Sequence, residues 1–136
     1  MAFVLDASVA LAWHFDDEAS EYADRVLDRL QEEDAFVPAI WPLEMANGLL
    51  AAERRSRLSP ADVARAHAIL SDLPITVNSL TLDDALGPVL DLARAQSLSA
   101  YDAAYLELAM REGLSLATQD DDLRAAAGRI GVALVG

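Results

Sequence analysis

The chain of 136 residues contains no cysteine and no lysine, and each absence excludes a class of function. Without thiols there can be no disulfide framework and no thiolate metal site, and His14 and His67 alone are too few for a zinc cluster. Without lysine there can be no phosphate-binding loop of the Walker type, because that loop needs its lysine. The chemistry of this chain must therefore rest on other residue types.

Positive charge is also scarce, since the formal net charge is −13. A protein that binds nucleic acid through its general surface is expected to carry a basic excess, so we expect no DNA binding by this chain alone. Any chemistry on nucleic acid must depend on a local site, on bound cations or on a basic partner. No apolar run reaches the roughly 18 residues of a membrane span, and the first residues carry no targeting signal. We expect a cytoplasmic protein without membrane contact.

The sequence alternates short apolar runs with amphipathic stretches, and its length predicts a single domain over residues 1–136. We expect strands at residues 3–5, 35–37, 75–77, 114–118 and 132–135. We expect helices at residues 8–13, 17–31, 42–55, 60–73, 82–95, 99–111 and 121–127, with Pro88 tolerated near a first turn or at a kink. This alternation predicts an α/β fold of three layers, in which a central, mainly parallel sheet has helices on both faces.

Carboxylates follow two of the expected strands. Phe3–Leu5 is typical of a strand buried on both faces, and ligands of open α/β sheets gather at the carboxyl ends of such strands. Asp6 follows this strand directly, and Asp120–Asp122 follow the strand that ends at Thr118. The alternative for both places is that the aspartates only cap the helices that come next.

Two further carboxylates stand among apolar neighbours near helix starts. Asp102 is followed at the helical spacings of three, four and seven positions by Tyr105, Leu106 and Ala109. An ionised group on such a face is costly unless it is paired, hydrogen-bonded or bound to metal. The alternative for Asp102 is a capping box with Ser99, and the alternative for Glu44 is an exposed first turn where it favours the helix dipole.

Four carboxylates at two strand ends and two helix starts can converge on one cleft of a parallel sheet. Carboxylates at close quarters repel one another, so their convergence would imply a cation. Oxygen ligands without histidine or thiolate favour Mg²⁺ or Mn²⁺, as one or two ions. Such ions activate water and stabilise the charged oxygens in phosphodiester cleavage, so the set predicts a metal-dependent nuclease site.

The ordered set of motifs resembles the PIN-domain ribonucleases, and in particular the VapC-type toxins of bacterial toxin–antitoxin pairs. The resemblance spans the whole chain and rests on Val4–Ser8, Trp41–Glu44 with Asn47, Tyr101–Tyr105 and Thr118–Asp120. It implies a Mg²⁺- or Mn²⁺-dependent endoribonuclease with a PIN-like fold, in which Asp6, Glu44, Asp102 and Asp120 occupy the acidic metal-site positions. It also implies that Ser8, Asn47 and Thr118 orient these carboxylates, while Asp121 or Asp122 could replace or supplement Asp120.

The resemblance further implies a homodimer and a cognate antitoxin whose C-terminal segment blocks the acidic site. A surplus of negative charge suits such a basic peptide. Arg54, Arg55 and Arg57 could contact RNA, but arginines at a helix end also complement its dipole, and this second interpretation is favoured. The aromatic side chains are expected in the core or in dimer contacts rather than under RNA bases: Trp13, Trp41, Tyr101 and Tyr105.

Two competing interpretations remain open at this stage. The first is an aspartate-based phosphoacceptor domain, but those families need a late lysine, and their phosphatases need a second aspartate where this chain has Ser8. The second is a PIN-like module without catalysis that only binds its partner, with the carboxylates acting as caps. Stabilisation by Mn²⁺ would separate a converged site from dispersed caps.

Overall fold

The computed structural model describes all residues, 1–136, and has a sheet of four parallel strands at its centre. The strands are β1 (Ala2–Leu5), β2 (Asp34–Val37), β3 (Ile75–Val77) and β4 (Ser115–Ala117), in the spatial order β3-β2-β1-β4. Each neighbouring pair is parallel, which confirms the expected sheet. Parallel strands need crossover connections, and helices supply them here.

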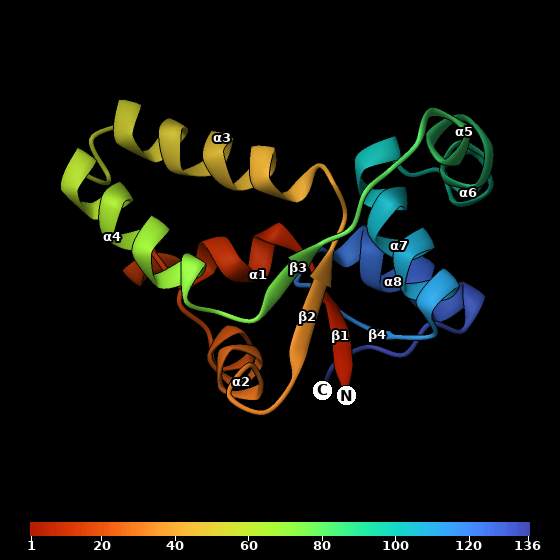
Figure 1. Cartoon of the computed structure of the whole chain (residues 1–136), viewed down its shortest axis with the longest axis horizontal. Helices are drawn as coiled ribbons and strands as arrows, with labels where there is room; N and C mark the ends of the chain where they lie inside the picture. Colours follow the sequence, from red (N-terminus) through yellow and green to blue (C-terminus); the bar gives the residue numbers. More distant parts are fainter.

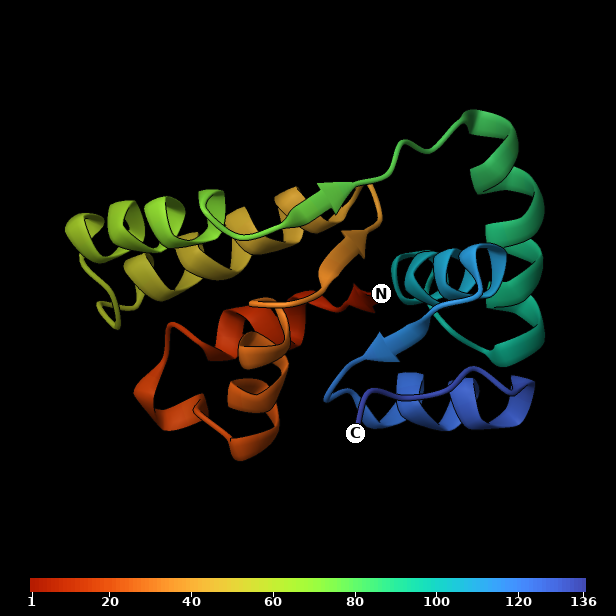
Figure 2. The same cartoon turned by 60° about the horizontal axis from the view of Figure 1, so that its bottom comes forward.

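Helices cover both faces of the sheet, as the alternation of strands and helices predicts (Figures 1 and 2). One side carries α1 (Ala7–Ala12), α2 (Glu21–Arg29), α3 (Trp41–Arg54) and α4 (Pro60–Ser71). The other side carries α5 (Leu82–Asp84), α6 (Leu90–Gln96), α7 (Ala100–Glu112) and α8 (Asp121–Ile130). No helix combines the length and the apolar character that crossing a membrane requires.

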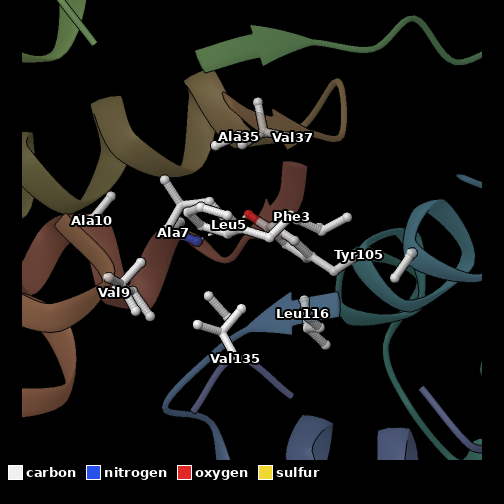
Figure 3. Packing of buried hydrophobic residues seen from close by; sticks show 14 of the residues in the cluster. Phe3, Leu5, Ala7, Val9, Ala10, Ala35, Val37, Tyr105, Leu116 and Val135 are labelled. Carbon is white, nitrogen blue, oxygen red and sulfur yellow. Dashed lines mark hydrogen bonds between the residues drawn. The ribbon is translucent and has the colours of Figure 1, made fainter. Parts of the chain in front are cut away.

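The core is built around β1, whose interior position buries it on both faces. Phe3, Val4 and Leu5 are completely buried, and Figure 3 shows Phe3 and Leu5 close to Leu116 of β4 and to the ring of Tyr105. Burying each large apolar side chain contributes roughly 1.5–3 kcal/mol, so this strand anchors the sheet. The apolar run that suggested a doubly buried strand is therefore correctly interpreted.

The strand order creates a switch point beside β1. After β1 the chain places β2 and β3 on one side of it, and it returns to place β4 on the other side. In open α/β sheets, ligands bind outside the carboxyl ends of the strands at this kind of reversal. Asp6 follows β1 and Thr118 follows β4, so the topology brings both expected strand ends to one place.

Three elements differ from the sequence-based expectation. The helix expected from residue 17 starts only at Glu21, because Ser20 caps it and Asp16–Glu18 form a separate 3₁₀ turn. The helix expected at 82–95 is interrupted by a π turn at Ala85–Val89, where Pro88 lacks the amide hydrogen that a regular helix would use. Residues 132–135 make only one bridge, from Leu134 to Leu116, and form no regular strand.

Candidate active site

Asp6 is almost completely buried at the carboxyl end of β1, with 6% of its surface exposed. Its Oδ2 accepts hydrogen bonds of 2.7 Å from the hydroxyl groups of both Ser8 and Thr118. Asp6 occupies the position before α1, yet its side chain forms no capping hydrogen bond with that helix. The interpretation of Asp6 as a mere cap is therefore wrong, and the two hydroxyl groups fix the orientation of its carboxylate.

Thr118 joins the two strand ends through one buried hydroxyl group. Its Oγ1 donates to Asp6 and accepts the backbone N–H of Asp120 at 3.1 Å. Asp120 in turn caps α8, since its Oδ1 accepts the N–H of Leu123 at 2.9 Å. Capping is therefore real at Asp120, but it occupies only one carboxylate oxygen. Asp120 is exposed, and its charge acts on the buried Asp6.

Asp102 stands in the first turn of α7, where its carboxylate lies near the hydroxyl group of Ser99 but completes no capping box. The chain contains three similar cap sequences, and in two of them, Ser59 with Asp62 and Thr81 with Asp84, both reciprocal hydrogen bonds are present. At the third, Ser99 accepts the N–H of Asp102 at 3.1 Å, but the aspartate returns no bond to the backbone of Ser99. The expected alternative of a complete capping box is wrong at this position.

Glu44 lies in the first turn of α3 and is half-buried rather than fully exposed. Its Oε1 accepts a hydrogen bond of 2.5 Å from the hydroxyl group of Tyr105, which lies on α7. The alternative was that Glu44 lies in an exposed turn and only favours the helix dipole. It does not account for this hydrogen bond or for the partial burial of Glu44. Glu44 is instead tied to the helix that carries Asp102.

The negative charges of neighbouring carboxylates help to raise the pKa of Asp6, Glu44 and Asp102. Burial raises the pKa of Asp6, and the negative charge of Asp120 raises it further. Burial also raises the pKa of Asp102, with added repulsion from Asp120, Asp6 and Asp122. The pKa of Glu44 is raised by burial and by the charges of Asp6 and Asp102, against the lowering effect of the Tyr105 hydrogen bond. Charge repulsion therefore links Asp6, Glu44 and Asp102 to one another and links Asp6 and Asp102 to Asp120, so all four lie in one region of the molecule.

The expected neighbours of these carboxylates take different places. Ser8 and Thr118 contact Asp6, as expected for side chains that orient it. Asn47 is exposed on α3 and forms no hydrogen bond with any of the four carboxylates, so the structure assigns it no orienting contact. Asp122 influences the pKa of Asp102, while Asp121 is exposed in the first turn of α8. Arg57 is paired with Asp17 and Glu18, at 2.9 and 3.3 Å.

The four carboxylates do not line the larger hollows of the surface. Those hollows are lined by other residues, chiefly along α3 and α4 and near the 3₁₀ turn. No three acidic or histidine side chains lie close enough together to enclose one ion. Mg²⁺ usually keeps several waters and takes only one or two carboxylates together with substrate phosphates, so this all-oxygen donor set fits that kind of ion.

Sequence reasoning missed Tyr105 as a member of the site. We expected a core or dimer residue, and its ring is indeed completely buried. Its hydroxyl group, however, bonds with Glu44 and accepts the backbone N–H of Ala7 at 3.3 Å. The available signal was its position three residues after Asp102, which places both side chains on the same face of α7.

Comparisons with known proteins agree with this geometry. The sequence matches the family model of the PIN domain over residues 3–129. Ribonuclease VapC3 of Pyrobaculum aerophilum is 30% identical over 123 residues, which cover 90% of this chain and 92% of that protein.

Solved structures show the same fold. PAE2754 from Pyrobaculum aerophilum superimposes with a TM-score of 0.68 at 27% identity, covering 93% of this chain and 87% of that one. A toxin–antitoxin complex from Klebsiella pneumoniae gives a TM-score of 0.67 at 18% identity, covering 96% of this chain and 94% of that one. Because the family model and a relative of 30% identity both span nearly the whole chain, this protein belongs to the PIN-domain family and is similar to the VapC-type proteins within it.

Proposed function

We propose that this protein is a metal-dependent endoribonuclease and the toxin of a type II toxin–antitoxin pair. The observation that carries the proposal is the carboxylate of Asp102, which completes no capping box, has the hydroxyl group of Ser99 beside it and lies within electrostatic reach of Asp6 and Asp120. Three repelling carboxylates at one sheet edge are unfavourable for folding alone, and a bound cation would relieve them. The name of the relative Ribonuclease VapC3 supports RNA as the substrate class.

The donor set favours Mg²⁺ or Mn²⁺, as one or two ions, because it consists of carboxylate oxygens with hydroxyl support. Asp6, Asp102 and Asp120 would hold the metal, directly or through its bound waters because no three acidic side chains surround one point, and Glu44 would position a second ion or the attacking water. When bound, the metal supplies an activated water and stabilises charge on the phosphate oxygens. Ser8 and Thr118 keep Asp6 oriented by donating from their hydroxyl groups to its Oδ2, and the backbone N–H of Ser8 also favours the charged form of this carboxylate.

The proposed partners are a cognate antitoxin and a second copy of this chain. One structural neighbour is a toxin–antitoxin complex, and another is VapBC2 from Rickettsia felis bound to a DNA fragment from their promoter. The net charge of −13 would attract a basic antitoxin segment to the acidic edge.

The test is cleavage of a mixed RNA pool by antitoxin-free protein. We expect cleavage with Mg²⁺ or Mn²⁺ and no cleavage with EDTA. We also expect no cleavage by the Asp6→Asn variant, whose amide oxygen can still accept the hydrogen bonds from the hydroxyl groups of Ser8 and Thr118. The matched control is Asp83→Asn, because Asp83 is exposed in α5 and outside the site. Full activity of the folded Asp6→Asn variant would refute the assignment, and a folded protein without activity towards any RNA would favour a module that only binds its partner.

Glu44 has its own expected result under the same proposal. The Glu44→Gln variant should lose cleavage while still binding one metal ion, because the remaining three carboxylates hold that ion. Calorimetry measures whether the variant still binds one Mn²⁺ ion, and the cleavage assay measures whether its activity is lost. Unchanged turnover in Glu44→Gln would remove Glu44 from the chemistry.

A further inference from the structure

The hydroxyl group of Tyr105 connects three elements of the site. Tyr105 lies on α7, donates to Glu44 on α3, and accepts the N–H of Ala7, the first residue of α1. The three residues are far apart in sequence, since 61 positions separate Tyr105 from Glu44 and 98 separate it from Ala7. One phenol group therefore fixes the relative position of the helices that carry Asp102, Glu44 and the start of α1.

The ring of Tyr105 needs no hydroxyl group for packing. It is completely buried among Phe3, Leu5 and Leu116 in the core, where a phenylalanine would bury the same ring (Figure 3). A buried hydroxyl group costs free energy unless it finds partners, and here both of its partners belong to the site. The position of the Tyr105 hydroxyl oxygen is thus determined by its two hydrogen-bond partners and not by packing in the core.

The hydroxyl group leaves the remaining oxygens of the site available. It occupies Oε1 of Glu44, and no other side-chain hydrogen bond is made by that glutamate, so Oε2 has no donor from the protein. It also accepts the first N–H of α1, from Ala7, a group that the side chain of an N-cap residue does not serve, because such a side chain accepts the second or third N–H. The carboxylate of Asp6 bonds separately with the hydroxyl groups of Ser8 and Thr118.

We propose that Tyr105 is a positioning residue that holds Glu44 through one carboxylate oxygen and presents the other to the water or ion used in RNA cleavage. This inference rests on the proposed nuclease function and deepens it, because Glu44 then acts with a single oxygen. Residues that orient metal-site ligands in this way typically contribute 10–100-fold to affinity or activity.

The test is the Tyr105→Phe variant, which keeps the buried ring and removes only the oxygen. We expect kcat for RNA cleavage to fall roughly 10–100-fold with KM unchanged, while the affinity for the first Mn²⁺ ion changes less than about twofold. The ¹³Cδ resonance of Glu44 should shift, because its carboxylate loses its donor. The matched control is Tyr22→Phe, since the hydroxyl group of Tyr22 is buried without a hydrogen-bond partner, and this variant should behave as the wild type.

The outcomes separate this inference from the function on which it rests. A wild-type protein without metal-dependent cleavage would refute the proposed function, and the role of Tyr105 with it. Active wild-type protein beside an equally active Tyr105→Phe variant would refute the role of Tyr105 alone. A loss of Mn²⁺ affinity as large as the loss of cleavage would also refute it, because that result indicates general damage to the site.

Discussion

At the scale of single residues, the site is organised by hydroxyl groups as much as by carboxylates. Thr118 is completely buried, and its Oγ1 links Asp6 to the backbone of Asp120. Asp6 has a raised pKa because it is buried, and the hydrogen bonds from Thr118 and Ser8 partly offset that effect. The hydroxyl groups therefore offset part of the cost of burying this carboxylate in its charged form.

Replacing Thr118 by valine should destabilise the folded protein. The change keeps the shape of the side chain but removes a hydrogen bond to a carboxylate and leaves the N–H of Asp120 without its partner. We expect a loss of about 1.5–3 kcal/mol in the free energy of unfolding, measured with urea in the presence of EDTA.

The control for this prediction is Thr76→Val on β3, because Thr76 is exposed and makes no side-chain hydrogen bond. Its effect should stay within about 0.5 kcal/mol. Equal effects of the two changes would contradict the account of Thr118.

The sequence identified the acidic residues of the site because their surroundings are unusual for charged groups. Asp6 ends an apolar strand and Asp102 lies on an apolar helix face, so both could be recognised from spacing alone. Tyr105 could not be recognised in this way, because an apolar neighbourhood suits its ring and the direction of its hydroxyl group depends on packing. Asn47 was expected to orient the carboxylates and is exposed instead.

At the scale of elements, the helix caps show which aspartates serve the fold. Asp62 and Asp84 complete capping boxes, with bonds of 2.9 and 3.2 Å from the backbone N–H of Ser59 and Thr81. Asp102 occupies the same sequence position in α7 without completing the box. The same sequence pattern thus forms a complete capping box in α4 and α5 but not in α7.

Alanine substitutions should reveal this difference between equivalent positions. Asp62→Ala and Asp84→Ala should each lower the free energy of unfolding of the metal-free protein, because each removes a bond that satisfies a backbone N–H at the helix start. Asp102→Ala should leave it unchanged or more stable, since it breaks no backbone bond and relieves repulsion from Asp120 and Asp6. Urea unfolding in EDTA measures all three, and a loss for Asp102→Ala as large as for Asp62→Ala would contradict the prediction.

The strands and most helices could be predicted from the sequence, and the failures have local causes. The π turn around Pro88 could not be predicted, because the sequence does not show how a helix accommodates a missing N–H in its interior. Residues 132–135 have the composition of a strand but make one bridge with β4, which is itself only three residues long. The pairing of such an end segment depends on the geometry of its neighbour and not on its own composition.

At the scale of the whole molecule, the converged carboxylates should make stability depend on pH in a predictable direction. The pKa of Asp102 is raised above its ordinary value by burial and then by Asp120 and Asp6. The folded state therefore binds more protons than the unfolded state between the ordinary and the raised pKa, and stability from this group falls as pH rises through that window.

The Asp102→Asn variant should isolate this effect in metal-free protein. Its stability relative to the wild type should increase as pH rises from about 4, the ordinary value for aspartate, and level off above the raised pKa. The comparison between the two proteins cancels other groups, such as His14, whose pKa burial lowers. A difference in unfolding free energy that does not change with pH would show that the Asp102 carboxylate is not strained by its neighbours.

The central claim is that carboxylates from β1, α3, α7 and the start of α8 converge to bind a divalent cation. The most direct measurement is the melting temperature of the wild type, Asp6→Asn and Asp83→Asn with and without Mn²⁺. At a concentration 100 times the dissociation constant, binding stabilises a protein by about 2.7 kcal/mol, or roughly 5–10 °C for a chain of this length. We predict this increase for the wild type and for Asp83→Asn, and none for Asp6→Asn. No increase in the wild type, or the same increase in all three proteins, would contradict the claim.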